Sequence, residues 1–124
     1  MIAKGTITLL TCTSEDLGIF ILHRGILLNN GEYVLHRAFK GVQLTHVNRF
    51  LRKRKILATK TYNLKKPVDI DKILARYKND KFDLITNNCE NFVNDFINTY
   101  TTSNRFHASQ SVAVYAIILT KLLL

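Results

Sequence analysis

The stretch His23–Ala38, HRGILLNNGEYVLHRA, holds two apolar runs separated by Asn30-Gly31. An Asn-Gly pair between β-forming residues is the strongest short-range signal for a hairpin, because both central turn positions require a positive φ. The flanking sequence is also rich in Ile, Leu, Phe and Thr, which favours strands. The expected strands of this first third of the chain are Thr6–Thr11, Ile19–Leu28 and Tyr33–Phe39.

The predicted hairpin brings two histidines to one face of the sheet. A two-residue turn pairs Gly25 with His36 and His23 with Ala38. His23 and His36 then become diagonal neighbours, with Cβ atoms up to about 7–8 Å apart. Because Gly25 and Ala38 are small, this face has room for two imidazoles and for the end of a helix, which outlines a pocket.

Length and composition favour one folded domain. The chain has 124 residues, of which 47% are hydrophobic and 22% charged, and this balance argues against disorder or low-complexity sequence. No repeat or linker divides it, so residues 1–124 are interpreted as a single domain. Within it, residues 111–124 form an apolar C-terminal segment that is too short to cross a bilayer as a helix.

Helices are expected after the hairpin. Thr45 is predicted to cap a short helix, and the basic run Arg52–Lys55 that follows is expected to be solvated. The range Ile56–Leu64 is weakly strand-like. Asp69 is predicted to cap a clear helix whose apolar face consists of Ile70, Ile73, Leu74 and Tyr77. The fold class is therefore α+β.

A third helix is predicted to begin near Cys89. Asn87 and Glu90 resemble a capping box, and the apolar stripe of this helix is Cys89, Phe92, Val93, Phe96, Ile97 and Tyr100. A helix start presents free N–H groups and partial positive charge, which favour the thiolate form of a cysteine. Cys89 is thus a candidate nucleophile, and the alternative is a small buried hydrophobic residue.

The other cysteine and histidines are given structural interpretations. Cys12 ends a strand and is expected in the core, whereas His46 and His107 lie in polar, loop-like contexts. The two cysteines lack a CxxC spacing, and no phosphate-binding glycine loop is visible, so neither a metal nor another cofactor is expected. Two cysteines also favour a reducing compartment, hence a cytoplasmic protein.

The segments around these residues resemble a known group. His23–Ile26, Tyr33–Ala38 and the block DLITNNCENFV at Asp83–Val93 resemble the signature of the lecithin:retinol acyltransferase-like group of the NlpC/P60 superfamily, which includes small viral proteins with an H-box and an NC motif. The similarity runs from about Lys4 to Phe96. One departure is Asn91, where acyltransferase-like members commonly carry His.

The resemblance implies a circularly permuted papain-like fold, in which a small antiparallel sheet packs against the helix that carries the nucleophile. It also implies that Cys89 is the nucleophile, that His23 is the base and that His36 orients His23. A Cys89 thioester would then form with an acyl group taken from an ester or amide.

Three functions are compatible with this sequence. The first is a thiol acyltransferase or phospholipase at a membrane surface, favoured by the basic residues near Arg52–Lys55 and the apolar C-terminal segment. The second is a cysteine peptidase or amidase. The third is a non-catalytic H-box/NC module that binds a protein or RNA. A phospholipid or membrane surface is the expected partner and a protein the alternative, whereas nucleic acid is not expected because no aromatics are interleaved with the basic run.

Overall fold

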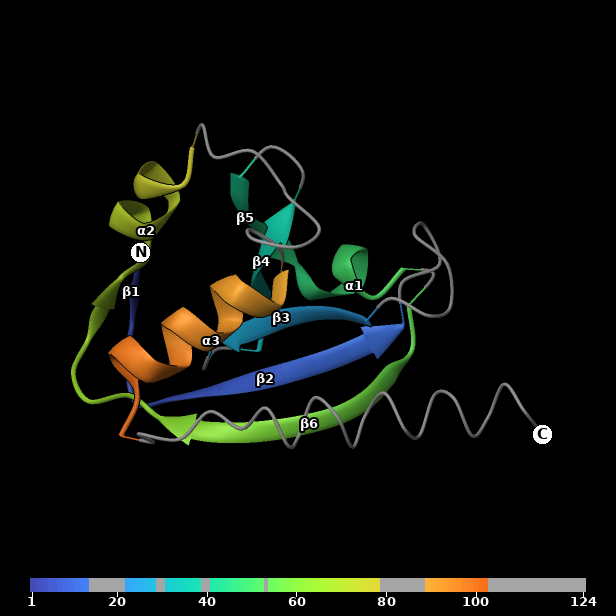
Figure 1. Cartoon of the computed structure of the whole chain (residues 1–124), viewed down its shortest axis with the longest axis horizontal. Helices are drawn as coiled ribbons and strands as arrows, with labels where there is room; N and C mark the ends of the chain where they lie inside the picture. The colour runs from blue at the N-terminus through green and yellow to red at the C-terminus, as the bar shows by residue number, and fades with distance from the viewer. Residues whose placement is uncertain (14–21, 29–30, 39–40, 53, 79–88, 103–124) are drawn as a thin grey trace.

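The computed structural model describes residues 1–13, 22–28, 31–38, 41–52, 54–78 and 89–102. They form a mixed α+β fold built on a five-stranded antiparallel sheet with strand order β5-β4-β3-β2-β6 (Figure 1). The strands of this sheet are β2 (Thr6–Thr13), β3 (Leu22–Leu28), β4 (Tyr33–Ala38), β5 (Gly41–His46) and β6 (Ile56–Asn63).

The smaller elements close one end of the sheet and cover its faces. A two-stranded sheet joins β1 (Ile2–Ala3) to β7 (Val68–Asp69). The helices are α1 (Val47–Phe50), α2 (Ile70–Arg76) and α3 (Cys89–Tyr100). Helix α3 packs on β3 and β4, and α1 lies to the right of α3 in Figure 1.

The predicted hairpin register is confirmed. Gly25 pairs with His36, and Leu27 pairs with Val34. Gly31 has a φ of 74°, and its N–H donates to the carbonyl of Leu28 at 2.9 Å, so the turn that this bond closes begins one residue earlier than the predicted two-residue turn. Residues 19–21 and 39, at the ends of the two expected strands, lie outside the described residues.

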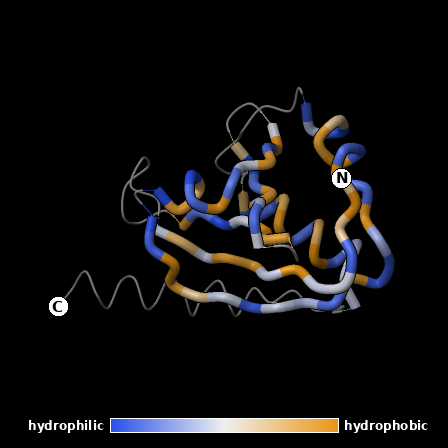
Figure 2. The backbone as a smooth tube through the Cα atoms, turned by 180° about the vertical axis from the view of Figure 1, so that it is seen from behind, coloured by the Kyte–Doolittle hydropathy of each residue, from blue (hydrophilic) through white to orange (hydrophobic). Residues whose placement is uncertain are grey.

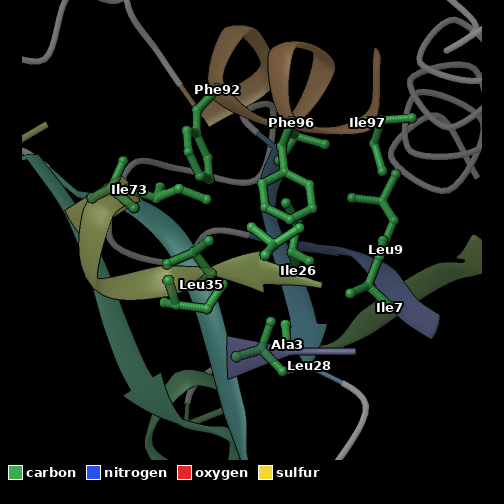
Figure 3. Packing of buried hydrophobic residues seen from close by; sticks show 14 of the residues in the cluster. Ala3, Ile7, Leu9, Ile26, Leu28, Leu35, Ile73, Phe92, Phe96 and Ile97 are labelled. Atoms are coloured by element: carbon green, nitrogen blue, oxygen red, sulfur yellow. The ribbon is translucent and has the colours of Figure 1, made fainter. Parts of the chain in front are cut away.

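The main core lies between α3 and one face of the sheet (Figure 3). The apolar stripe predicted for this helix is confirmed, since all its members are buried except Tyr100, which is half-buried. Strand alternation directs Ile26 and Leu35 towards α3, and it directs Val34 to the opposite face. There Val34 packs with Leu10, Cys12 and Phe50 in a second cluster. Both faces of the central strands are therefore buried.

The predicted helix at Ile70 is confirmed with its cap. The Asp69 carboxylate accepts a hydrogen bond from the N–H of Asp71 at 3.1 Å. The amino group of Met1 forms an ion pair with Asp71 in the first turn of this helix at 2.6 Å. The pairing of β1 with β7 was not expected from the sequence, because each strand has only two residues.

The region after Gly41 differs from the prediction. Residues 41–46 form the edge strand β5, and Thr45 lies within it instead of capping a helix. The cap of α1 is His46, whose Nδ1 accepts from the N–H of Asn48 at 3.2 Å. The basic run is only partly solvated, since Arg54 is half-buried and donates to the carbonyl of Phe50 at 2.7 Å.

The other edge strand becomes polar along its length. Figure 2 shows β6 hydrophobic at its start and more hydrophilic towards its end. Polar residues on an edge strand oppose pairing with other chains. Among the described residues, no helix is long and apolar enough to cross a membrane. The C-terminal segment 111–124 and His107 lie outside the described residues.

Candidate active site

The two histidines expected on one face are in contact. The ring centroids of His23 and His36 are 5.5 Å apart, with an edge-to-face angle of 74°. His23 is half-buried, and His36 is 7% exposed. The Nε2 atom of His36 shares a hydrogen bond of 2.7 Å with the hydroxyl of Thr45 in β5. The hairpin therefore forms an imidazole pair in which the position of one ring is fixed by the edge strand.

Phe50 fills the space above Gly25. Its ring centroid lies 5.4 Å from that of His23 and 5.0 Å from that of His36. A Cβ atom at Gly25 would overlap Val34 Cγ1 and lie 2.9 Å from Phe50 Cζ. The small residue thus makes room for an aromatic ring of α1. The end of a helix thus lies where one was expected, but this helix is α1, which ends at Phe50, and not the helix that carries Cys89.

Both imidazoles are held in their neutral form. Burial, together with the nearby Arg54 and His36, lowers the pKa of His23 to about 3. Burial and Arg54 lower the pKa of His36 to about 4, opposed by a contact with the backbone of Arg37. Among the described residues, neither Nε2 of His23 nor Nδ1 of His36 has a hydrogen-bond partner, although both atoms are buried. A neutral imidazole has one nitrogen free to accept a proton.

Cys89 is the first residue of α3, and its thiol is buried. The residue is 8% exposed, and its Sγ donates a hydrogen bond of 3.5 Å to the carbonyl of Leu22. Burial raises the pKa of the thiol, while the backbone and the charge of Arg24 oppose this effect. The backbone at the helix start does favour the thiolate, but desolvation outweighs it, so the pKa of the buried thiol is raised.

Arg24 is a buried positive charge near the sulfur that the sequence pattern did not predict. Its side chain is 2% exposed, and its Nη1 lies 4.0 Å from Oε1 of Glu90 in the first turn of α3. A buried arginine next to a cysteine favours the charged thiolate. The residue stands directly after His23 in the signature segment, but an arginine in a strand gives no indication by itself that it is buried.

The thiol and the imidazoles approach β3 from different sides. His23 alternates with Leu22 and Arg24, so its side chain points to the α1 face, whereas α3 packs on the other face. The Leu22 carbonyl that binds Sγ belongs to the peptide bond preceding His23, which places the sulfur close to the backbone of this histidine. Within the described parts of the chain, no hydrogen bond joins Cys89 Sγ to either ring.

Cys12 has the core position that was expected. It pairs directly with His23 across β2 and β3, and it is fully buried. Burial raises the pKa of its thiol to about 11. In the portion of the chain that the structure covers, no group of three His, Cys, Asp or Glu residues is arranged to hold a metal ion.

Thr45 was missed as a partner of His36 because β5 was not recognised as a strand. Once residues 41–46 are paired with β4, Gln43 faces His36 and Thr45 is its diagonal neighbour. The expected N-cap of α3, Asn87, lies outside the described residues.

Comparisons with known proteins give no relative for this chain. No protein-family model, no curated protein and no solved structure matches it.

Proposed function

We propose that this chain is a cysteine-dependent acyl-transfer enzyme with a papain-like arrangement of its sheet and cysteine helix. In this proposal Cys89 is the nucleophile, His23 is the general base and His36 orients His23. The observation that carries the proposal is the position of Cys89 Sγ, which lies 3.5 Å from the carbonyl of the peptide bond that leads into His23. The resemblance of the two histidine segments and the Asn-Cys-Glu block to lecithin:retinol acyltransferase-like proteins supports the same roles.

The reaction begins from a neutral thiol and a neutral imidazole. His23 takes the thiol proton as Sγ attacks an ester carbonyl, and the N–H of Cys89 at the start of α3 helps to stabilise the oxyanion. His23 then protonates the leaving alcohol, which gives a thioester on Cys89. Water or a second nucleophile resolves this thioester. Substrate entry has to bring the His23 ring and Sγ into hydrogen-bond distance.

A phospholipid is the acyl donor that the proposal favours. The net charge of +9 attracts the chain to an anionic surface, and Arg49 of α1 is exposed, as are Arg52 and Lys55 shortly after this helix. A peptidase or amidase would use the same residues and the same thioester, and differs only in the substrate.

The non-catalytic module is the second candidate, and the burial of Cys89 favours it. Cys89 is 8% exposed, its thiol has a raised pKa, and no imidazole of the described residues is hydrogen-bonded to its sulfur. An inert core cysteine has the same environment. The two candidates therefore differ in whether the thiol ever carries an acyl group.

Intact mass distinguishes them. The wild type, Cys89→Ala and the matched control Cys12→Ala are incubated with phosphatidylcholine vesicles containing phosphatidylserine, and lysolipid is measured in parallel. The proposal predicts an acyl adduct and lysolipid with the wild type and Cys12→Ala, and neither with Cys89→Ala. Cys89-dependent cleavage of peptide substrates without lysolipid would favour the peptidase. A folded wild type that shows neither lysolipid release nor peptide cleavage would favour the non-catalytic binding module.

A further inference from the structure

A groove of about 680 Å³ runs beside the edge strand β5, and His36 of the proposed site is among the residues that line it. Four consecutive residues of this strand, Val42–Thr45, line it. Helix α1 and the residues after it contribute Arg49, Phe50 and Arg54, and α2 and the residues after it contribute Leu74, Ala75 and Lys78. The volume lies in the range of sites that bind ligands.

The groove passes over the free edge of β5. Val42 and Leu44 belong to the face of the strand that packs on the main core. Gln43 and Thr45 belong to the opposite face, where Thr45 bonds to His36. Side chains of both faces line one continuous groove, so the main chain at the outer edge of β5 lies between them.

The hydrogen-bond pattern identifies which backbone groups point into the groove. The N–H of Val47 donates to the carbonyl of Glu32 at 2.7 Å, which extends the β4–β5 ladder by one bonded pair. Bonded and non-bonded pairs alternate in an antiparallel ladder. The groups of Gln43 and Thr45 therefore face β4, and those of Val42, Leu44 and His46 face outward. Within the described residues, β5 pairs with β4 alone.

The charge around this edge has one sign. Arg49, Arg54 and Lys78 line the groove, and no Asp or Glu of the described residues lines it. An acidic ligand is favoured there, consistent with the net charge of +9. Phosphate groups offer acceptors only and leave the outward carbonyls of Val42 and Leu44 unsatisfied. A peptide backbone supplies both donors and acceptors at the spacing of a strand.

We propose that the groove binds an extended acidic segment of a partner protein, which adds to the sheet as a strand beside β5. Its backbone pairs with Val42, Leu44 and His46. Its acidic side chains reach Arg49 and Lys78 at the two sides of the edge.

The test uses an acetylated, fluorescein-labelled peptide of alternating Glu and Val, with fluorescence anisotropy as the readout on the full chain. Its controls are the same peptide with Lys in place of Glu, and one N-methylated at alternate amides. Methylation removes strand donors without changing charge. The proposal predicts that the Glu peptide binds, and that each control peptide binds at least about tenfold more weakly.

Variants of the protein separate local from general charge effects. Arg49→Glu/Lys78→Glu should weaken binding by about tenfold or more, whereas Lys60→Glu/Lys65→Glu, with the same change in net charge, should weaken it by less than about threefold. Amide exchange should slow at Leu44 when the peptide binds. Cys89→Ala should bind as the wild type does, so this result is independent of the proposed reaction.

Three results would overturn the proposal. They are equal binding of the N-methylated peptide, an equal loss in both charge variants, and unchanged exchange at Leu44. A single-stranded oligonucleotide or an anionic vesicle that binds through Arg49 and Lys78 while the Glu peptide does not would also overturn it, and would assign the groove to a phosphate ligand.

Discussion

Replacement of Gly25 by Ala should destabilise the protein through overlap with two buried side chains. An added Cβ would overlap Val34 Cγ1 and lie 2.9 Å from Phe50 Cζ. Val34 is fully buried, and Phe50 is 1% exposed, so neither side chain has free space to move into. The Phe50 ring also contacts both imidazoles, and its displacement would disturb the histidine pair.

The expected size of the effect follows from two opposing terms. Overpacking of a dense core costs about 1–3 kcal/mol. Replacing Gly by Ala restricts the unfolded chain and recovers about 0.4–1 kcal/mol. The free energy of unfolding should therefore fall by about 1–2 kcal/mol, and the thermal midpoint should fall by about 5 °C per kcal/mol.

A double-mutant cycle tests the cause. Urea unfolding is followed by circular dichroism for the wild type, Gly25→Ala, Val34→Ala and the double variant. Val34→Ala removes the overlapping methyl group. The loss in free energy of unfolding of the double variant should therefore be smaller than the sum of the two single losses, by about 0.5–1 kcal/mol or more. Gly5→Ala is the control, because its φ of 78° causes strain although nothing lies within 4 Å of its Cβ. It should show no coupling to Val34→Ala.

Additive effects in the Gly25 cycle would refute the packing argument. So would a Gly25→Ala midpoint that equals that of the wild type, since this would mean that Phe50 moves without cost.

Three further effects are expected. The folded-state pKa values of His23 and His36, about 3 and about 4, lie below the unfolded value of 6.5, so the unfolded chain takes up protons first as the pH falls. Between pH 7 and pH 5 each histidine should reduce the free energy of unfolding by about 2 kcal/mol. In urea titrations at several pH values, a His23→Gln/His36→Gln variant should lose most of this pH dependence. An unchanged pH dependence would contradict the buried neutral pair. Asp69→Ala removes the cap of α2 and should cost about 0.5–2 kcal/mol by thermal melting, with no loss contradicting the capping bond of 3.1 Å. Burial and raised pKa values should make Cys12 and Cys89 react with iodoacetamide at pH 8 at least about tenfold more slowly than in urea, and rapid labelling of Cys89 in the native protein would indicate an open site.

Local sequence signals predicted the parts of this fold that depend on near neighbours in the chain. The register of the hairpin follows from Asn30-Gly31, and the buried stripe of α3 follows from the spacing after Cys89. The cap at Asp69 is equally local. In each case one turn or one helix face determines the outcome.

Contacts between distant segments were not predictable from the same signals. β5 contains Gly41, Gln43 and Thr45, which weaken the strand pattern, and it forms because β4 offers an edge to pair with. The position of Phe50 over Gly25 depends on that strand, since β5 carries the chain to α1. Burial of the Cys89 thiol likewise depends on where α3 meets β3.

The balance at Cys89 shows why the sequence rule for helix starts did not predict the thiol pKa. The partial charge at a helix N-terminus contributes about 0.3–1 kcal/mol and at most about 2, which is less than about 1.5 pKa units. Full burial can shift a pKa by about 3–5 units. Desolvation therefore dominates while the sulfur is covered, even with the Arg24 charge opposing it. Entry of water or a polar substrate between α3 and β3 reduces only the desolvation, whereas the helix and Arg24 still favour the anion. The nucleophilic character of this thiol is consequently determined by what covers it.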